Sequence, residues 1–248
     1  MAAFAIIKLV NFIKSFKNEL LQWNQYYIIT TYIKPTTYIV LEVELFFKCK
    51  SEEFENIYQK HYKNIITHEF IRSKLGLSDS VRLKLNGTFK RELLLLDEDD
   101  CIFNVVYRIQ TALWYNSETD KWQYVSIFPS FIKRYYQPSL NMLEYISCGV
   151  KKDDSIFKCI DDPEAILDSE DRISRLIRHL EKGSSKANYP ALLNSKYTEV
   201  YNKPLSVTES LNTITKRFPI LYLLVLTARQ FFGKQNGVLS LVNTVISL

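Results

Sequence analysis

The chain contains few of the residues from which enzyme active sites are usually built. Its 248 residues include 6 glycines, 4 cysteines and 3 histidines. The glycines are too dispersed to form a phosphate-binding loop, and there is no P-loop, G-x-G-x-x-G, G-x-S-x-G or H-E-x-x-H motif. These absences favour a protein that is not an enzyme without deciding the question, and no cofactor is expected.

Metal-ligand spacing is also missing. The cysteines form no C-x-x-C pair and have no histidine at ligand spacing, which argues against a zinc site and against a disulfide framework. These residues are Cys49, Cys101, Cys148 and Cys159. His61 and His68 would lie about 10 Å apart along a helix axis, too far for one ion. Acidic clusters at 97–100, 153–154 and 161–162 leave a divalent-metal nuclease as a third-ranked alternative, although turns and helix caps explain each cluster.

No apolar run is long enough to cross a bilayer, which takes about 20 residues. The apolar stretch in the first 23 residues is interrupted by Lys8, Lys14 and Lys17, and no small-x-small cleavage site follows it. This stretch therefore predicts an amphipathic helix in place of a signal peptide. Because 47% of the residues are hydrophobic and glycine and proline are scarce, we expect an ordered, soluble, cytoplasmic protein.

The first region, residues 1–75, is predicted to contain strands and a helix. Residues 26–47 are rich in β-branched and aromatic residues, which indicates two strands joined by a turn at Lys34–Pro35. Residues 51–75 carry apolar residues at helical spacing, and Gly76 ends the predicted helix.

The second region, residues 76–136, has the pattern of an antiparallel meander of four or five strands. Asn86–Gly87 lies between segments of alternating apolar and basic residues, and this dipeptide readily adopts the positive φ angles of a tight hairpin turn. The remaining predicted elements are the turn 97–100, the strand 101–114, the loop 116–121 and the strand 122–128.

The third region, residues 137–183, is predicted to be a cluster of helices. Pro138–Ser139 and Asp162–Pro163 have the residue types that begin a helix. A third helix is expected from Asp168 or Ser169 to Lys182, ending at Gly183. Its apolar residues follow the i, i+3, i+4, i+7 spacing of a buried face, which turns its basic residues outward.

Basic residues in the second and third regions are candidates for contact with nucleic acid. A DNA-binding helix presents Arg, Lys, Asn or Gln to base edges, and flanking basic residues neutralise phosphates. The candidates are Arg172, Arg175, Arg178 and His179 on the third helix, with Lys133 and Arg134 before the cluster. A net charge of +5 is compatible with a polyanionic partner. A solvated basic surface is the alternative explanation, because exposed helix faces are commonly charged.

The last region, residues 184–248, is predicted to open with a flexible linker in the segment GSSKANYP. Ser206 to Glu209 has the pattern of a capping box that begins a helix. A strongly apolar helix ending at Gly233 and a last helix at 238–248 should then bury themselves against the rest of the chain or against a second copy. A homodimer through these helices is the interpretation we favour, and a chain-swapped or membrane-surface contact is the alternative.

The order of segments from 81 to 182 resembles a known arrangement. NGTFKREL, then SIFPSFIKRYYQPSLNMLEYI, then ISRLIRHL is similar to uncharacterised zinc-ribbon and helix-turn-helix proteins associated with bacterial transposases. The resemblance implies a ribbon, a basic and aromatic linker and a helix-turn-helix that binds DNA. The ribbon cysteines of that family are absent here, so a ribbon in this chain would be metal-free and held by apolar packing.

Taken together, these patterns predict an α+β protein with a central antiparallel meander, a helix-turn-helix-like cluster and C-terminal helices. The leading hypothesis is a non-enzymatic DNA-binding or regulatory protein associated with a mobile element. A protein-interaction or assembly module is the second hypothesis, since the chain has 16 tyrosines and 15 phenylalanines from which an aromatic contact surface could be built.

Overall fold

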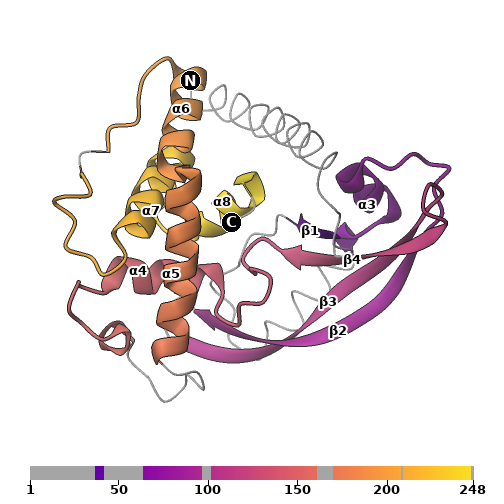
Figure 1. Ribbon diagram of the computed structural model, residues 1–248, viewed down its shortest axis with the longest axis horizontal. Coiled ribbons are helices and arrows are strands. Elements are labelled where there is room, and N and C mark those ends of the chain that lie inside the picture. The colour runs from indigo at the N-terminus through magenta and orange to yellow at the C-terminus, as the bar shows by residue number, and fades with distance from the viewer. Residues whose placement is uncertain (1–36, 42–63, 97–101, 161–169, 208, 247–248) are drawn as a thin grey trace.

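A computed structural model of the chain describes residues 37–41, 64–96, 102–160, 170–207 and 209–246. The protein is α+β, as predicted, with a sheet toward one end of the molecule and most helices at the other (Figure 1). Several predicted features lie outside the described ranges. They are the N-terminal amphipathic helix, the first predicted strand with its turn at Lys34–Pro35, residues 51–63 of the next predicted helix, the turn at 97–100 and the helix beginning at Asp162–Pro163. Within the described ranges, no helix has the length and apolarity needed to span a membrane.

The described strands form one sheet in the order β1-β4-β3-β2. They are β1 (Thr37–Leu41), β2 (Leu83–Leu96), β3 (Ile102–Asn116) and β4 (Lys121–Pro129). β2, β3 and β4 form the predicted antiparallel meander, and β1 adds to β4 in parallel. The meander therefore has three strands among the described residues, where four or five were predicted.

The prediction of a hairpin at Asn86–Gly87 is wrong, because β2 runs straight through this dipeptide. The register with β3 shifts here, and Gly87 adopts its positive φ of 75° within a β-bulge. Thr111 Oγ1 donates hydrogen bonds to the carbonyls of Asn86 and Gly87, both at 3.0 Å, and Gln110 Nε2 donates to the Gly87 carbonyl at 2.8 Å. Since β3 is long enough to pair with both halves of β2, the continuous ladder outweighs the local turn preference.

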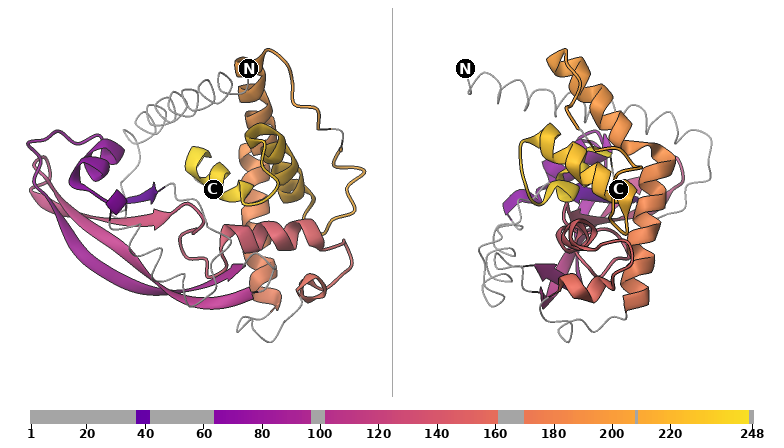
Figure 2. Two further views of the ribbon diagram at one scale, coloured as in Figure 1. Left: turned by 180° about the vertical axis from the view of Figure 1, so that it is seen from behind. Right: turned by 90° about the vertical axis from the view of Figure 1, so that its left-hand side faces the viewer.

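Helices make up most of the remaining described chain (Figure 2). They are α3 (His68–Leu75), α4 (Leu140–Gly149), the 3₁₀ turn η1 (Ile156–Cys159), α5 (Glu170–Ala187), α6 (Tyr189–Tyr201), α7 (Pro219–Phe232) and α8 (Val238–Ile246). The predicted ends of α3 at Gly76 and of α7 at Gly233 are confirmed, and both glycines have a φ of 65°. The predicted start of α4 is also confirmed, since Ser139 Oγ accepts a hydrogen bond from Met142 N at 3.2 Å.

Two predictions on the C-terminal region are wrong. α5 does not end at Gly183 but continues to Ala187, and Asn188, with a φ of 50°, leads directly into α6. The predicted linker is therefore helical, and within it Ser184 is buried and donates to the Leu180 carbonyl at 2.9 Å. The described residues around the predicted capping box, 202–207 and 209–218, contain no helix.

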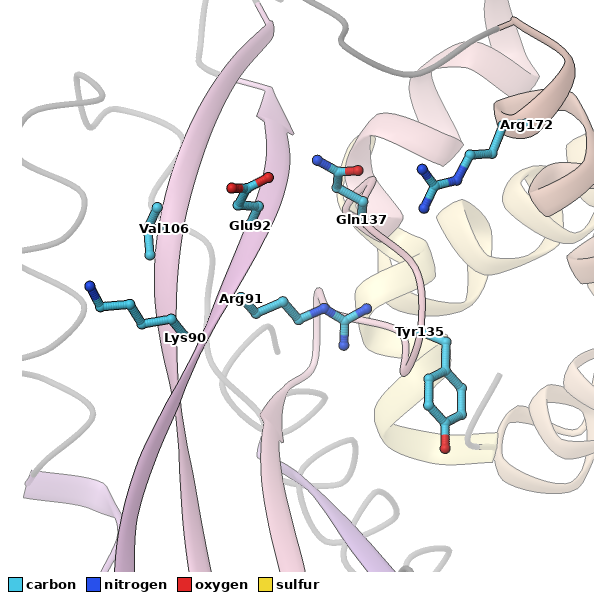
Figure 3. A pocket seen from close by; sticks show the side chains of 7 residues that line it. All are labelled: Lys90, Arg91, Glu92, Val106, Tyr135, Gln137 and Arg172. Carbon is cyan, nitrogen blue, oxygen red and sulfur yellow. The ribbon is translucent and has the colours of Figure 1, made fainter.

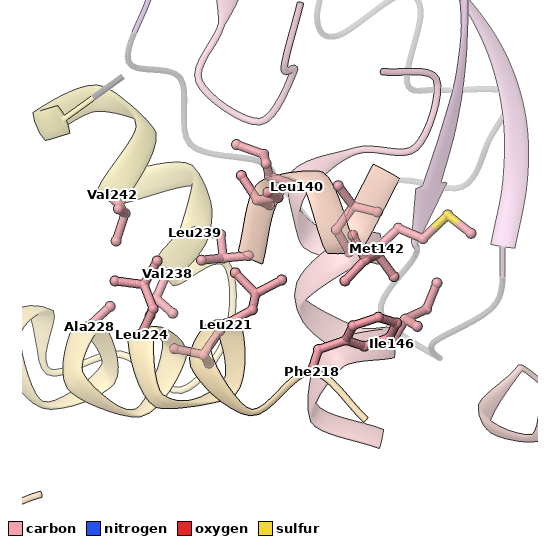
Figure 4. Close-up of a cluster of buried hydrophobic side chains, with 14 of the residues drawn as sticks. Leu140, Met142, Ile146, Phe218, Leu221, Leu224, Ala228, Val238, Leu239 and Val242 are labelled. Carbon is pink, nitrogen blue, oxygen red and sulfur yellow. The ribbon is translucent and has the colours of Figure 1, made fainter. Parts of the chain in front are cut away.

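The helices are held together mainly by α7, which packs on α4, α5, α6 and α8. α4 and α5 are separated by residues 150–169, a longer connection than the turn of about three or four residues in a helix-turn-helix. The buried apolar residues of α7 and α8 lie within the same chain's core (Figure 4). Covering these apolar residues therefore does not require the predicted homodimer.

The end of β2 is shared by two hydrophobic clusters. Leu93 and Leu95 belong to the cluster formed by the sheet and α3, whereas Leu94 and Leu96 belong to the helical cluster. Because successive strand residues point to opposite faces, one strand contributes alternately to both cores. All four leucines are buried, and the backbone of Leu94 also pairs with the segment before α4, accepting from Ser139 N at 2.8 Å.

One carboxyl group is buried in the helical cluster. Glu144 on α4 is 3% exposed, and its Oε2 accepts a hydrogen bond from Leu239 N at 3.0 Å, in the first turn of α8. Arg229 on α7 lies 3.9 Å from Glu144 Oε1 and 3.7 Å from the sulfur of Cys148. Burial raises the pKa of Glu144 to about 7, although the α8 amides and Arg229 oppose this shift.

Candidate nucleic-acid interface

α5 presents a row of basic side chains along its outer surface. Its apolar residues Ile173, Ile177 and Leu180 are buried in the helical cluster, and the helix runs along the outside of the molecule (Figure 2). The four candidates on this helix, Arg172, Arg175, Arg178 and His179, are all exposed, as predicted. The extension of α5 beyond Gly183 adds Lys186 to the exposed Lys182.

Five of these residues share one narrow sector of the helix. At 100° and 1.5 Å per residue, they fall within an arc of about 80° and extend over about 21 Å. We call them the basic row, and they are Arg172, Arg175, His179, Lys182 and Lys186. Arg178 lies about 40° outside this sector. The two arginines and two lysines of the row therefore form a line of positive charge that is long enough to follow several phosphates of a nucleic-acid strand.

Two of the three acidic residues on α5 do not face the basic row. Glu170 accepts hydrogen bonds from Ser155 Oγ at 2.7 Å and from Arg217 at 3.0 Å, and these contacts lower its pKa. Glu181 accepts from Ile220 N at 2.9 Å at the start of α7, and burial raises its pKa. Asp171 is the carboxylate on α5 that stays exposed. The carboxylates on α5 therefore offset less of the positive charge of the basic row than the sequence alone suggests.

A groove lies between β2 and the start of α5. Its volume is about 640 Å³, and it is lined by Lys90, Arg91, Glu92, Val106, Tyr135, Gln137 and Arg172. Arg91 extends from β2, and Arg172 extends from α5, toward the loop that carries Tyr135 and Gln137 (Figure 3). Three cations and one carboxylate line the groove, so it has the charge sign that favours an anion.

Arg91 holds the loop that precedes α4. Its guanidinium donates to the carbonyls of Tyr136 at 2.5 Å and Lys133 at 3.3 Å, and burial lowers its pKa. The tight loop leaves Tyr135 with a φ of 70° and a side chain 75% exposed. A left-handed backbone at a tyrosine is strained by about 1–2 kcal/mol, and here the tertiary contact of Arg91 holds it.

The two candidates on this loop differ in their surroundings. Lys133 is half-buried with its Nζ 5.5 Å from the centre of the Tyr136 ring, and burial lowers its pKa. Arg134 packs over the ring of Tyr135 at 4.6 Å. The structure thus brings the loop and Arg172 together at the groove, while Arg175, Arg178 and His179 lie farther along α5.

Sequence reasoning missed Lys90 and Arg91. They stand in a strand segment of alternating residues, FKREL, and nothing in that pattern indicates that the loop some 45 residues later contacts Arg91. The sequence does not predict Lys186 as part of the helix, because Gly183 favours a helix end before it. Extending the helical spacing by one turn would have placed Lys186 in line with Lys182.

Of the three acidic clusters, the structure describes the one at 153–154, and it belongs to no candidate metal site among the described residues. No group of three His, Cys, Asp or Glu residues in these ranges could hold an ion. Asp154 is bonded to Lys158 at 2.5 Å, which lowers its pKa. The clusters at 97–100 and 161–162 lie outside the described residues.

No protein-family model, curated protein or solved structure matches this chain. The resemblance to transposase-associated proteins consequently stays a prediction. The candidate interface is supported by the arrangement of the basic row and the groove alone.

Proposed function

We propose that this protein binds duplex DNA without acting as an enzyme, using the basic row of α5. The observation that carries the proposal is the alignment of five basic side chains within one sector of an exposed helix, with two of the three carboxylates on that helix facing away from the row and bonded to other segments. Basic side chains at this spacing neutralise phosphates and fix the register of a protein on a duplex.

The groove extends the proposed contact beyond α5. Arg172 belongs to both the basic row and the groove, so a strand that follows the row would meet Lys90 and the exposed ring of Tyr135 at one end. Association with a mobile element, a regulatory role and a cytoplasmic location are parts of the same proposal that rest on the sequence alone.

The proposal is tested by the salt dependence of duplex binding. Fluorescence anisotropy with a random 20-base-pair duplex should give an affinity that falls steeply as salt rises, because binding releases counterions. The double variant Arg172→Ala, Arg175→Ala should bind more weakly, and its log–log salt slope should be smaller by about 1.8, or about 0.9 for each phosphate that is no longer neutralised.

A charge-matched control separates a local contact from net charge. Lys151→Ala, Lys152→Ala removes two exposed lysines outside α5 and the groove and should leave the slope almost unchanged. Absence of duplex binding at low salt, or equal reductions of affinity in the two double variants, would contradict the proposal. A partner protein that binds the chain with little salt dependence would instead favour the assembly-module hypothesis.

A further inference from the structure

The sheet carries a second basic and aromatic surface, far along β2 from the groove. The pairing register aligns side chains of three strands in two rows on one face of the sheet. The first row is Arg82, Tyr115 and Trp122, and the second is Lys84, Leu113 and Tyr124. We call these six residues the stacking face. The side-chain geometry agrees with the register, since the Arg82 guanidinium lies 4.0 Å from the centre of the Tyr115 ring.

Two aromatic rings of the stacking face are open to solvent. Trp122 is 43% exposed and Tyr124 is 37% exposed, although both stand on a strand whose other end is buried. The opposite side of the sheet at this end carries Ile39, Ala112 and Val125, which are buried in the cluster with α3. At this end of the sheet, one face is therefore buried in the hydrophobic core, and the face that carries the aromatic residues is exposed.

The rings are held in position by their neighbours. Tyr115 packs edge-on against Trp122, with ring centres 5.6 Å apart and an angle of 69° between the planes. The Tyr115 hydroxyl is hydrogen-bonded to the carboxylate of Asp120 in the β3–β4 turn. Lys84 Nζ lies 4.7 Å from the centre of the Trp122 ring. Trp122 is thus oriented before any partner arrives, which reduces the entropy lost on binding.

We infer that the stacking face binds single-stranded nucleic acid, with unpaired bases stacked on Trp122 and Tyr124 and phosphates beside Arg82 and Lys84. Two aromatic residues at i and i+2 on one strand face the same way about 7 Å apart, so each can receive one base. Base stacking on aromatic side chains combined with a cationic rim is the usual means of binding a single strand without reading its sequence.

Charge complementarity favours this occupant over an apolar protein surface. An apolar partner would remove Arg82 and Lys84 from water and offer no counter-charge, which costs free energy. A single strand supplies a phosphate for each cation and a ring face for each aromatic residue. This site goes beyond the proposed duplex contact, because it lies on other elements and requires unpaired bases.

The test compares a labelled 12-nucleotide thymidine strand with an abasic strand of the same length and charge, using the full chain and fluorescence anisotropy. Trp122→Ala, Tyr124→Ala should weaken binding of the thymidine strand by at least about fivefold, the lower limit for removal of one stacked base. Leu85→Ala is the control, since Leu85 is a 46% exposed apolar residue on the opposite face of β2. The abasic strand should bind the unchanged protein more weakly than the thymidine strand.

A second variant keeps the test valid if the aromatic double variant does not fold. Lys84→Glu reverses one rim charge at an exposed position and should weaken binding, most strongly at low salt. Equal binding of the thymidine and abasic strands, or unchanged binding in both sets of variants, would overturn the inference. The Arg172→Ala, Arg175→Ala variant should keep its affinity for the thymidine strand. The experiment can therefore refute single-strand binding by the stacking face without refuting duplex binding by the basic row, and the reverse.

Discussion

The buried carboxyl of Glu144 should make the stability of the protein depend on pH in a defined window. The pKa of this group is about 7 in the folded protein, against an ordinary value of 4.5. The folded state therefore binds the proton more tightly than the unfolded state does. The stability that comes from the neutral carboxyl is fully present below pH 4.5 and is lost as the pH rises through 7.

The size of the effect follows from the pKa difference. At about 1.4 kcal/mol per pKa unit, a rise from 4.5 to about 7 corresponds to about 3 kcal/mol of unfolding free energy. Glu144→Gln removes the titration and keeps an oxygen that can accept from Leu239 N. The variant should therefore gain about 3 kcal/mol relative to the natural protein between pH 4.5 and pH 8.

Urea denaturation at pH 4.5, 5.5, 6.5 and 8 measures this difference directly. The glutamine also changes the contact with Arg229, but arginine stays charged throughout this range, so that change should be a constant offset at every pH. Stability curves that remain parallel from pH 4.5 to 8 would refute the reasoning. Such a result would mean that the folded protein ionises Glu144 as easily as the unfolded chain does.

Two glycine substitutions, one at the end of α4 and one inside α5, should change the stability of the protein in opposite directions. Gly149→Ala should destabilise the protein by about 1–3 kcal/mol, because the new Cβ would lie 2.9 Å from Cys159 Cβ. An unchanged melting temperature would contradict this prediction and would mean that η1 can move away from α4 at little cost. Gly183→Ala should instead stabilise it by up to about 1 kcal/mol, because no atom lies within 4 Å of the new Cβ and alanine favours a helix. A decrease in stability at Gly183, measured by thermal melting, would argue against the continuation of α5.

Local signals located the helices whose ends are set by a few neighbouring residues. Ser139 caps α4, and Gly233 ends α7 in a left-handed conformation, and each effect acts within one turn of the helix. The outward face of α5 was predicted for the same reason, since Ile173 and Ile177 at helical spacing fix which side is buried. Periodicity thus located four of the six candidate residues on an exposed helix.

Predictions failed where tertiary contacts compete with local preference. Gly87 favours a turn, but pairing with β3 makes it a bulge, and only the partner strand could reveal this. Gly183 favours a helix end, yet α5 continues to Ala187, because Ser184 packs in the interior of the protein. The groove depends on the contact from Arg91 to Tyr136, which joins two segments that no local window contains.

The strand end shared by the two clusters bears on how the protein could be dissected. A fragment ending after the meander would keep Leu93 and Leu95 buried but would expose Leu94 and Leu96 to water. A fragment starting at the helices would lose the same two leucines from its core. Each burial is worth about 1.5–3 kcal/mol, a large share of the stability of a small fragment. Neither half should fold on its own. A destabilising substitution in either half should therefore lower the stability of both, and the two should unfold in one cooperative transition.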